Sequence, residues 1–193
     1  MRVTGAFATI RRMSDIRPGS HWRFQGNEAT YLQEALDRGF TAGPDGTMRD
    51  RFEKAFREKY GVKYAITSNS GTSPLHQALA AFGVGPGDEV IIPPLGPVMP
   101  AYTVIQAGAI PVFADVDEST FLLDPKDVEK KITDKTKAIM PVHLYGGVCD
   151  MSAIMDIAKK HDLFVLEDCA QCLLGIDASG RYAGTVGDAG SFS

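Results

Sequence analysis

The sequence has few cysteines, no surplus of positive charge and no long hydrophobic run, and each absence excludes a class of protein. Three cysteines among 193 residues are an odd and sparse set, which fits a reducing compartment better than a disulfide framework. A formal net charge of −4 disfavours a general nucleic-acid binder, because such proteins carry a basic surplus. No apolar run approaches the roughly 18 residues that span a bilayer. We therefore expect a cytoplasmic protein that binds neither nucleic acid nor membrane.

What the sequence does have is the composition of a folded globular domain. Its residues are 44% hydrophobic and 23% charged, within the range of globular proteins, and a chain of this length buries a sizeable core. The length is compatible with one large domain or with a piece of a larger protein. Residues 1–26 mix Arg, Gly and Pro with Trp22 and Phe24, so we expect an N-terminal arm there that packs on another surface.

From residue 27 onward, the spacing of hydrophobic residues predicts an α/β fold. Apolar runs typical of strands alternate with segments of helical period. The expected strands are residues 64–67, 89–92, 110–114, 138–144 and 164–166. Helices between successive strands imply crossover connections, so we expect a three-layer sandwich in which helices cover a mainly parallel sheet. In such sheets, ligands bind beyond the carboxyl ends of the strands.

The first predicted strand ends in a segment that suits an anion. Residues 68–74 read S-N-S-G-T-S-P and lead directly into a helix. The hydroxyls of Ser70 and Thr72, the small Gly71 and the free N–H groups of a helix start all favour anion binding. An ordinary capped helix has the same pattern, because Ser and Thr are common caps. The residues alone therefore leave both interpretations open.

The last predicted strand ends in two adjacent carboxylates, Glu167 and Asp168. Because side chains alternate along a strand, one carboxylate can point into the ligand crevice while the other faces elsewhere. A buried carboxylate needs a cationic or donor partner, so an Asp at this position predicts a positively charged ligand atom. A lone His such as His143 is more often structural than catalytic, but its position beside the strand that carries Asp168 favours a function.

Cys169 and Cys172 form a C-x-x-C, a spacing shared with redox and zinc motifs. Thioredoxin-type pairs normally sit at a helix start, and a structural zinc site needs a second ligand pair. Cys149, His143 and His161 do not supply that pair. We therefore expect no metal site, and cysteines that act as small buried side chains.

With these motifs, the chain resembles the DegT/DnrJ/EryC1/StrS family of pyridoxal-phosphate enzymes, which are sugar aminotransferases of fold type I. The resemblance covers roughly residues 27–193. Each motif is weak alone, and it is the series in family order that carries the resemblance. The motifs are G-F-T-A-G-P at 39–44, S-G-T at 70–72, G-V-G-P-G-D-E-V at 83–90, P-V-F-A-D-V-D at 111–117, T-K-A-I-M-P-V-H-L-Y-G at 136–146, E-D-C-A-Q at 167–171 and G-D-A-G-S-F-S at 187–193.

The resemblance implies pyridoxal 5'-phosphate as the cofactor. It implies that Asp168 pairs with the protonated pyridine nitrogen, which keeps the ring an electron sink, and that Gln171 hydrogen-bonds the phenolic oxygen. His143 lies near the ring in relatives. The predicted catalytic residues are Asp168 and His143, and the predicted cofactor-binding residues are Ser70, Gly71, Thr72, Asp168, Gln171 and Ser193.

Two features depart from the family pattern. Pro97 stands where relatives have an aromatic residue that stacks on the cofactor. The lysine that forms a Schiff base in relatives lies a few residues beyond the F-S that ends this chain at Ser193, and helical lysines such as Lys159 and Lys160 are poor substitutes. Residues 27–193 are thus expected to be the N-terminal part of the large cofactor-binding domain, truncated before that lysine and the small C-terminal domain, and inactive alone.

The function implied by the resemblance is transfer of an amino group from glutamate or glutamine to a keto sugar, usually nucleotide-linked, or to a keto cyclitol. One alternative is a sugar dehydratase of the same family, in which His replaces the lysine. Another is an inactive α/β fragment or a cofactor-binding module. Relatives are homodimers with active sites at the subunit interface, so a second copy of the chain is the expected partner.

Overall fold

The computed structural model describes residues 26–44 and 46–193, which divide into two compact units at Ala55 and Phe56. The predicted arm, residues 1–26, lies outside the described residues except for Gly26. In the first unit, helix α1 (Glu28–Asp37) is followed by the start of α2 (Met48–Tyr60). An ion pair of 2.8 Å between Arg51 Nη1 and Glu34 Oε1 ties these two helices together. None of the described helices combines the length and the apolar character that a membrane crossing requires.

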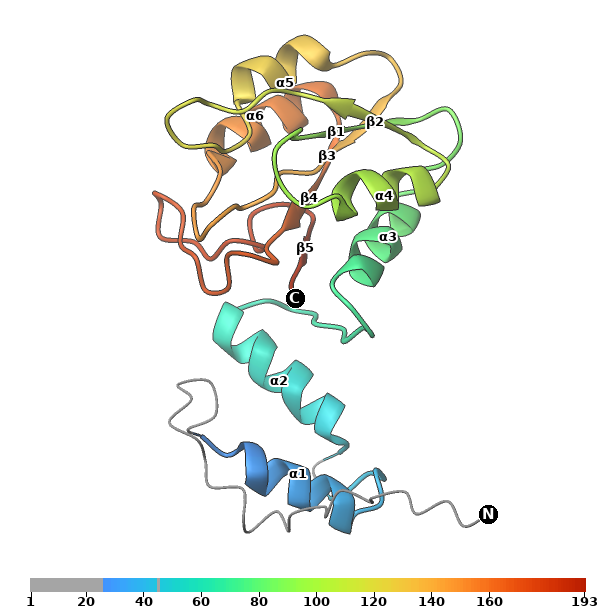
Figure 1. Cartoon of the computed structure of the whole chain (residues 1–193), viewed down its shortest axis with the longest axis vertical. Coiled ribbons are helices and arrows are strands. Elements are labelled where there is room, and N and C mark those ends of the chain that lie inside the picture. The colour runs from blue at the N-terminus through green and yellow to red at the C-terminus, as the bar shows by residue number, and fades with distance from the viewer. Residues whose placement is uncertain (1–25, 45) are drawn as a thin grey trace, which may run out of the picture. The chain divides into compact units, whose positions relative to one another are not determined.

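The second unit is an α/β sandwich (Figure 1). Its described elements form a sheet of five strands in the order β2-β1-β3-β4-β5, and every pairing is parallel. This confirms the predicted α/β class and parallel sheet. The elements in chain order are α3 (Thr72–Ala81), β1 (Glu89–Ile92), α4 (Met99–Gln106), β2 (Ile110–Phe113), α5 (Pro125–Lys131), β3 (Thr136–Ile139), α6 (Met151–His161), β4 (Phe164–Asp168) and β5 (Ala189–Ser191).

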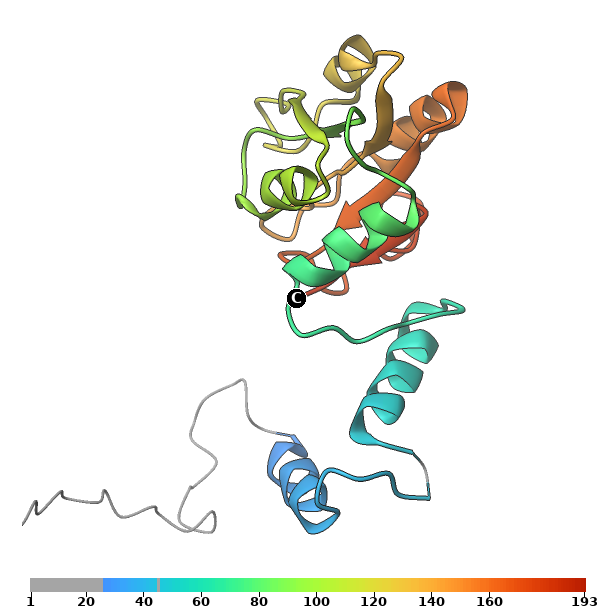
Figure 2. The ribbon, with the colours of Figure 1, turned by 90° about the vertical axis from the view of Figure 1, so that its right-hand side faces the viewer.

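Alternation along the strands builds a separate core on each face of the sheet. One core joins Val165 of β4 to Val128 of α5 and Ile154 of α6. The other joins Leu166, the next residue of β4, to Leu75 of α3. Figures 1 and 2 show the same arrangement, with α5 and α6 on one side of the sheet and α3 and α4 on the other. The middle strands are buried on both faces, as is usual for parallel sheets.

The prediction of a first strand at residues 64–67 is wrong. These residues, all described, form no strand, and Tyr64 and Ile66 are 72% and 82% exposed. The strand beside β4 at this end of the sheet is instead β5, a three-residue strand that the sequence analysis did not predict. β3 is also shorter than predicted: Pro141 lacks the N–H that a ladder needs, and only a single bridge, Val142 to Asp168, continues the pairing.

Gly190 of β5 fixes how closely the chain can fold beside β4. A Cβ at this position would lie 2.6 Å from the Gly184 Cα and 2.8 Å from its carbonyl carbon, so the backbone would have to move. We expect Gly190→Ala to lower the free energy of unfolding by about 1–3 kcal/mol, the usual cost of overpacking. Urea unfolding followed by circular dichroism measures the change.

Gly85→Ala is the matched control, because a Cβ at Gly85 meets nothing within 4 Å. This variant should unfold within about 0.5 kcal/mol of the parent chain. Equal stability of the two variants would show that the contact between Gly190 and Gly184 does not constrain β5.

Candidate functional site

The candidate site lies where the carboxyl ends of β4 and β5 meet the start of α3. Asp168 ends β4 and pairs in register with Ser191 of β5. The Ser191 hydroxyl donates a hydrogen bond of 3.1 Å to the Gly71 carbonyl oxygen, just before α3 begins. The fold therefore joins two predicted site residues that are distant in the sequence, Gly71 and Asp168, through Ser191.

At the start of α3, only glycine fits at Gly71. A Cβ there would lie 2.5 Å from the Ser193 Cβ and 2.7 Å from the Ser193 Oγ. Gly71 is also the N-cap residue of α3, and the described chain supplies no side-chain cap to it. The Ser70 hydroxyl instead accepts a hydrogen bond from the Ser73 N–H at 3.2 Å. Hydroxyl groups thus gather around a helix N-terminus, where the partial positive charge favours an anion.

Asp168 is a buried carboxylate that lacks a cation. Its side chain accepts a hydrogen bond from the Ala170 N–H at 3.0 Å, and no described Lys or Arg pairs with it. It lies on the α3 side of the sheet, because Leu166, two residues earlier, packs in that core. Burial raises the pKa of Asp168, and the Ala170 hydrogen bond and His143 offset only part of that rise. A cationic ligand atom next to Asp168 would favour the charged carboxylate and so lower its pKa again.

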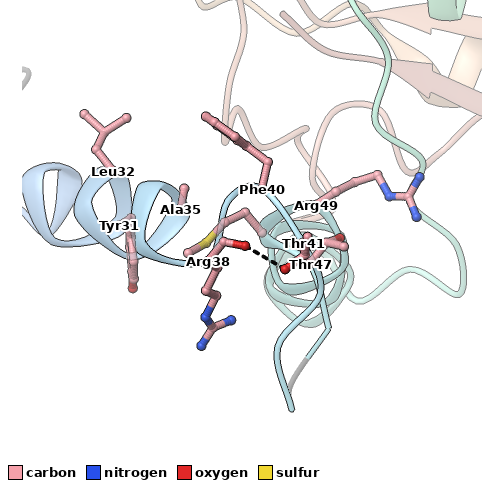
Figure 3. Close-up of a pocket in the computed structure, with 9 residues that line it drawn as sticks. Tyr31, Leu32, Ala35, Arg38, Phe40, Thr41, Thr47 and Arg49 are labelled. Carbon is pink, nitrogen blue, oxygen red and sulfur yellow. Dashed lines mark hydrogen bonds between the residues drawn. The ribbon is translucent and has the colours of Figure 1, made fainter.

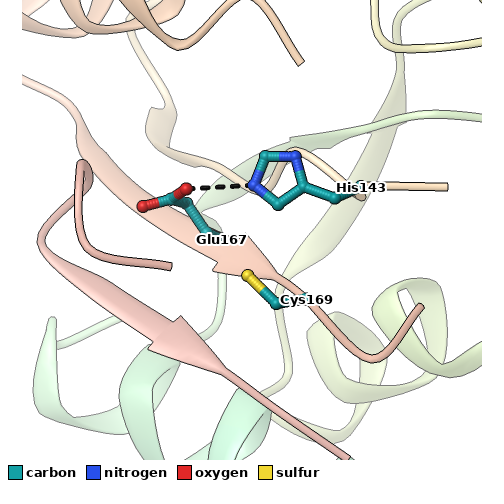
Figure 4. Close-up of side chains that lie close together, drawn as sticks. All are labelled: His143, Glu167 and Cys169. Atoms are coloured by element: carbon teal, nitrogen blue, oxygen red, sulfur yellow. Dashed lines mark hydrogen bonds and ion pairs between the residues drawn. The ribbon is translucent and has the colours of Figure 1, made fainter. Parts of the chain in front are cut away.

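Glu167, the neighbour of Asp168, differs from it because its carboxylate has several hydrogen-bond donors within the protein. It is fully buried, and its carboxylate accepts hydrogen bonds from the backbone N–H groups of Gly184, Val186 and Gly187 at 2.7–2.8 Å. Its Oε2 lies 3.0 Å from the His143 Nε2 (Figure 4). Burial alone would raise the pKa of Glu167, but these hydrogen bonds outweigh it and hold the pKa below its usual value.

Both ring nitrogens of His143 are engaged within the protein. The Cys149 N–H donates to Nδ1 at 3.1 Å, so Nδ1 carries no proton. The proton must then sit on Nε2, where it is donated to Glu167; this tautomer follows from the hydrogen-bond network. His143 is fully buried. The structure gives it a partner for each nitrogen, and its catalytic role stays a prediction.

The side chains of His143, Glu167 and Cys169 are close enough together for a metal site, with donor atoms all within 4.8 Å of one another. The chemistry of the donors does not fit one. The Nε2 lone pair would be available only after loss of its proton, and Glu167 already accepts four N–H bonds. Burial also raises the pKa of the Cys169 thiol, whereas a metal ligand must be a thiolate.

The three described cysteines are free thiols and all are buried. Cys169 and Cys172 pack with Ala183 in a small apolar cluster, which confirms the prediction of small buried side chains. Burial raises the pKa of Cys149 to about 12. Thiols of this kind are poor nucleophiles at neutral pH, because the thiolate is the reactive form.

Gln171 and Ser193 lie at the exposed rim of the site. The Gln171 Oε1 accepts a hydrogen bond from the Tyr145 N–H at 3.2 Å, which leaves the side-chain amide nitrogen without a partner among the described residues. Ser193 lies against Gly71. Pro97, predicted to occupy the stacking position, is half-buried in the loop after β1.

The sequence analysis missed Ser191 as a site residue. Its hydroxyl is buried and links β5 to the start of α3. The signal was present, because Ser191 precedes the predicted Ser193 by two residues and faces the same side of an extended segment. Three of the four partners of Glu167 were not predictable, since they are backbone groups 17–20 residues further along the chain.

A separate hollow of about 460 Å³ lies within the first unit, between α1 and the start of α2 (Figure 3). It contains none of the predicted site residues. Its walls are mostly apolar, and a hydrogen bond from the Thr41 hydroxyl to the Arg38 carbonyl oxygen closes the turn beside it. The lining residues are Tyr31, Leu32, Ala35, Arg38, Phe40, Thr41, Thr47, Met48 and Arg49.

Comparison with known proteins gives consistent matches. Residues 23–193 match the model of the DegT/DnrJ/EryC1/StrS aminotransferase family. The GDP-perosamine synthase of Caulobacter vibrioides is 47% identical over 89% of this chain and 46% of its own length. The L-glutamine:2-deoxy-scyllo-inosose aminotransferase of Streptomyces lividus is 43% identical over 92% of this chain and 43% of its own.

Solved structures match the fold as well. An aminotransferase from Psychrobacter cryohalolentis superposes with a TM-score of 0.82 at 41% identity, over 88% of this chain and 43% of that one. The "putative sugar aminotransferase Spr1654" from Streptococcus pneumoniae, in its PLP form, superposes with a TM-score of 0.78 at 31% identity, over 86% of this chain and 45% of that one. The chain spans less than half the length of the curated relatives it matches.

The raised pKa of Asp168 predicts that this residue costs stability when no ligand is bound. A raised folded-state pKa adds stability below the unfolded pKa of about 3.9, and that stability is lost as the pH rises through the folded value. Asp168→Asn keeps the acceptor for Ala170 and removes the charge. We expect the variant to be more stable at pH 7, on the order of 1 kcal/mol, with the difference fading toward pH 3 in urea unfolding.

Asp117→Asn is the control of opposite sign. Hydrogen bonds from Ser119 and Thr120 lower the pKa of Asp117, so its contribution to stability is present at neutral pH and lost as the pH falls through that lowered value. Asp117→Asn should therefore destabilise the chain at pH 7. An Asp168→Asn variant that is also less stable at pH 7 would contradict the description of Asp168 as an uncompensated carboxylate.

Proposed function

The chain belongs to the DegT/DnrJ/EryC1/StrS aminotransferase family, and on that premise we propose that it binds pyridoxal 5'-phosphate for transfer of an amino group to a keto sugar or keto cyclitol. The observation that carries this proposal is the pairing of two incomplete sites. A helix start lined by hydroxyls, whose N-cap glycine has no side chain to cap it, and a buried carboxylate without a cation among the described residues are joined by one hydrogen bond, from Ser191 to Gly71. Pyridoxal 5'-phosphate has an anionic phosphate and a ring nitrogen that takes a proton.

The phosphate end of the proposed site is the start of α3. Gly71 lets the backbone and the Ser193 hydroxyl approach closely, and Ser70 and Thr72 add hydroxyls on the adjoining turn. Hydrogen bonds from such groups to an ionised phosphate are among the stronger ones in proteins. We propose that these four residues bind the phosphate.

The ring end of the proposed site is Asp168. Its carboxylate would hold the proton on the pyridine nitrogen, because an adjacent negative charge raises the pKa of a cationic group. When bound, the cofactor supplies the electron sink for bond changes at the substrate carbon that bears nitrogen. We propose that Gln171 donates its free amide N–H to the phenolic oxygen of the cofactor. We propose that His143 influences the cofactor ring from the opposite face of the sheet.

The proposed substrates follow from the relatives. Their names specify a GDP-linked sugar product in one case and L-glutamine with a cyclitol ketone in another. We propose a keto sugar or keto cyclitol as acceptor and glutamate or glutamine as donor for the whole protein. Because the relatives extend over about twice the matched length, we further propose that residues 27–193 are part of the large cofactor-binding domain.

Binding of pyridoxal 5'-phosphate to the chain tests the proposed cofactor. We expect saturable binding, seen as a change in cofactor absorbance, and a Kd raised at least about tenfold by Gly71→Ala. A Cβ at Gly71 would displace Ser193 and obstruct the helix start. Pyridoxal, which lacks the phosphate, should bind the parent chain more weakly and respond less to the same substitution.

Gly85→Ala serves again as the matched glycine control and should leave both affinities unchanged, since its surroundings are open. A parent chain that shows no preference for pyridoxal 5'-phosphate over pyridoxal would refute the phosphate site.

A second copy of the chain is the proposed protein partner. Among the described residues, α1 buries none of its side chains, and Tyr31, Leu32 and Leu36 are 47–58% exposed. An exposed apolar stripe of this kind is typical of an interaction surface.

Light scattering after size-exclusion chromatography should give twice the chain mass. Leu32→Glu should shift the mass toward a monomer, because it places a charge in that stripe, whereas Glu58→Gln on α2 should not. A monomeric parent chain across the micromolar range would contradict the proposal.

A further inference from the structure

We propose that Glu167 is a positioning residue, whose carboxylate sets the place of β5, and with it Ser191 and Ser193, against the start of α3. Together with the Cys149 N–H, it also fixes the tautomer of His143. The effect on ligand binding rests on the proposed function, whereas the effect on His143 does not.

The carboxylate of Glu167 accepts hydrogen bonds both from the backbone of residues 184–187 and from the His143 ring. Three of its donors, Gly184, Val186 and Gly187, lie within four consecutive residues that lead into β5. The fourth donor is the ring of His143, which follows β3 in the chain. The backbone N–H of His143 also donates to the Asp168 carbonyl oxygen at 3.0 Å. The residues just after β3 and the residues just before β5 are thus connected through a single side chain.

Only an ionised carboxylate satisfies these four partners. Each partner is an N–H donor, and the unprotonated Nδ1 of His143 is already used by the Cys149 N–H. A glutamine has the same shape but would direct its own N–H groups at one or more of these donors. In a fully buried site, every donor left without an acceptor carries a desolvation penalty. The side chain therefore specifies both its charge state and the positions of its partners.

The position of β5 transmits this constraint to the anion site. Gly190 pairs with Glu167 and Ser191 pairs with Asp168, and the Cys169 N–H donates to the Ser191 carbonyl oxygen at 2.8 Å. Ser191 then reaches Gly71, and Ser193 lies against it. A shift of residues 184–187 would move both hydroxyls relative to α3.

Glu167 performs this role without contact with the ligand. Because side chains alternate along β4, it faces the α5 and α6 side of the sheet, whereas Asp168 faces α3. We therefore expect substitutions at Glu167 to change the geometry of the phosphate contacts more than the contacts to the ring.

The first experiment measures binding of pyridoxal 5'-phosphate and of pyridoxal to Glu167→Gln, Glu167→Asp and the parent chain. We expect Glu167→Gln to raise the Kd for pyridoxal 5'-phosphate about tenfold or more and the Kd for pyridoxal by much less. Glu167→Asp keeps the acceptor oxygens and should recover part of the lost preference.

Asp188→Asn is the matched control for the binding experiment. Asp188 also uses its carboxylate to fasten the same segment to β4, through the Val165 N–H at 2.8 Å, but at the opposite end of the strand pair and without His143. Asn keeps an acceptor for this single N–H, so Asp188→Asn should leave the preference for phosphate intact. An equal loss of preference in Asp188→Asn and Glu167→Gln would overturn the proposal.

The second experiment needs no cofactor. The ¹⁵N chemical shifts of His143 in the parent chain should show a proton on Nε2 and none on Nδ1 at pH 7, and the amides of Gly184, Val186 and Gly187 should exchange slowly with solvent. A ring protonated on Nδ1, or on both nitrogens, would overturn the assignment, as would fast exchange of all three amides.

The two experiments separate the possible failures. If the parent chain binds no pyridoxal 5'-phosphate, the proposed function fails, and the imidazole and amide spectra still decide the role of Glu167. If Glu167→Gln does not fold, Glu167→Asp and the spectra of the parent chain decide it.

Discussion

One buried carboxylate with four N–H partners organises the carboxyl end of the sheet. Glu167 accepts hydrogen bonds from His143 on one side and from residues 184–187 on the other. In our proposal, the position of residues 184–187 determines the position of β5. Asp168, one residue further along β4, shows the opposite pKa shift: burial raises its pKa, and no described cation offsets that rise. The alternation of a strand puts two acids of opposite character on opposite faces. Glu167 has its hydrogen-bond partners within the protein, and Asp168 is the acid that we propose pairs with a ligand.

The sequence predicts most of this fold, and it places Asp168 of the candidate site at the end of a strand, as the structure does. Strands such as Glu89–Ile92 were predicted because a run buried on both faces is apolar throughout. Residues 64–67 also favour a strand by residue type but form none in the structure, because strand propensity describes a suitable surface rather than a pairing. β5 was missed because Ala189, Gly190 and Ser191 contain no apolar run, and their place follows from Glu167. Asp168 was correctly placed at the end of a strand, whereas no strand forms before Gly71 and most partners of Glu167 are backbone groups whose positions only the folded chain defines.

The site combines tight packing with an electrostatic cost. Gly71 and Gly190 are places where backbone and side chains leave no room for a Cβ, so the segments that carry Ser191 and Ser193 are held closely. Asp168 is buried, and this burial raises its pKa, so its surroundings disfavour the charged form of the side chain. Sites that bind charged ligands commonly store instability in this way, and the surrounding structure compensates for it.

The buried cysteines have a consequence for how opening of the site is observed. Cys149 donates its N–H to His143, and Cys169 and Cys172 pack beside the strand that carries Glu167. Burial holds the pKa of the Cys149 and Cys169 thiols far above neutral, so a reagent that attacks thiolates must wait until the chain opens locally. The rate at which these cysteines are alkylated therefore reports how frequently the carboxyl end of the sheet opens.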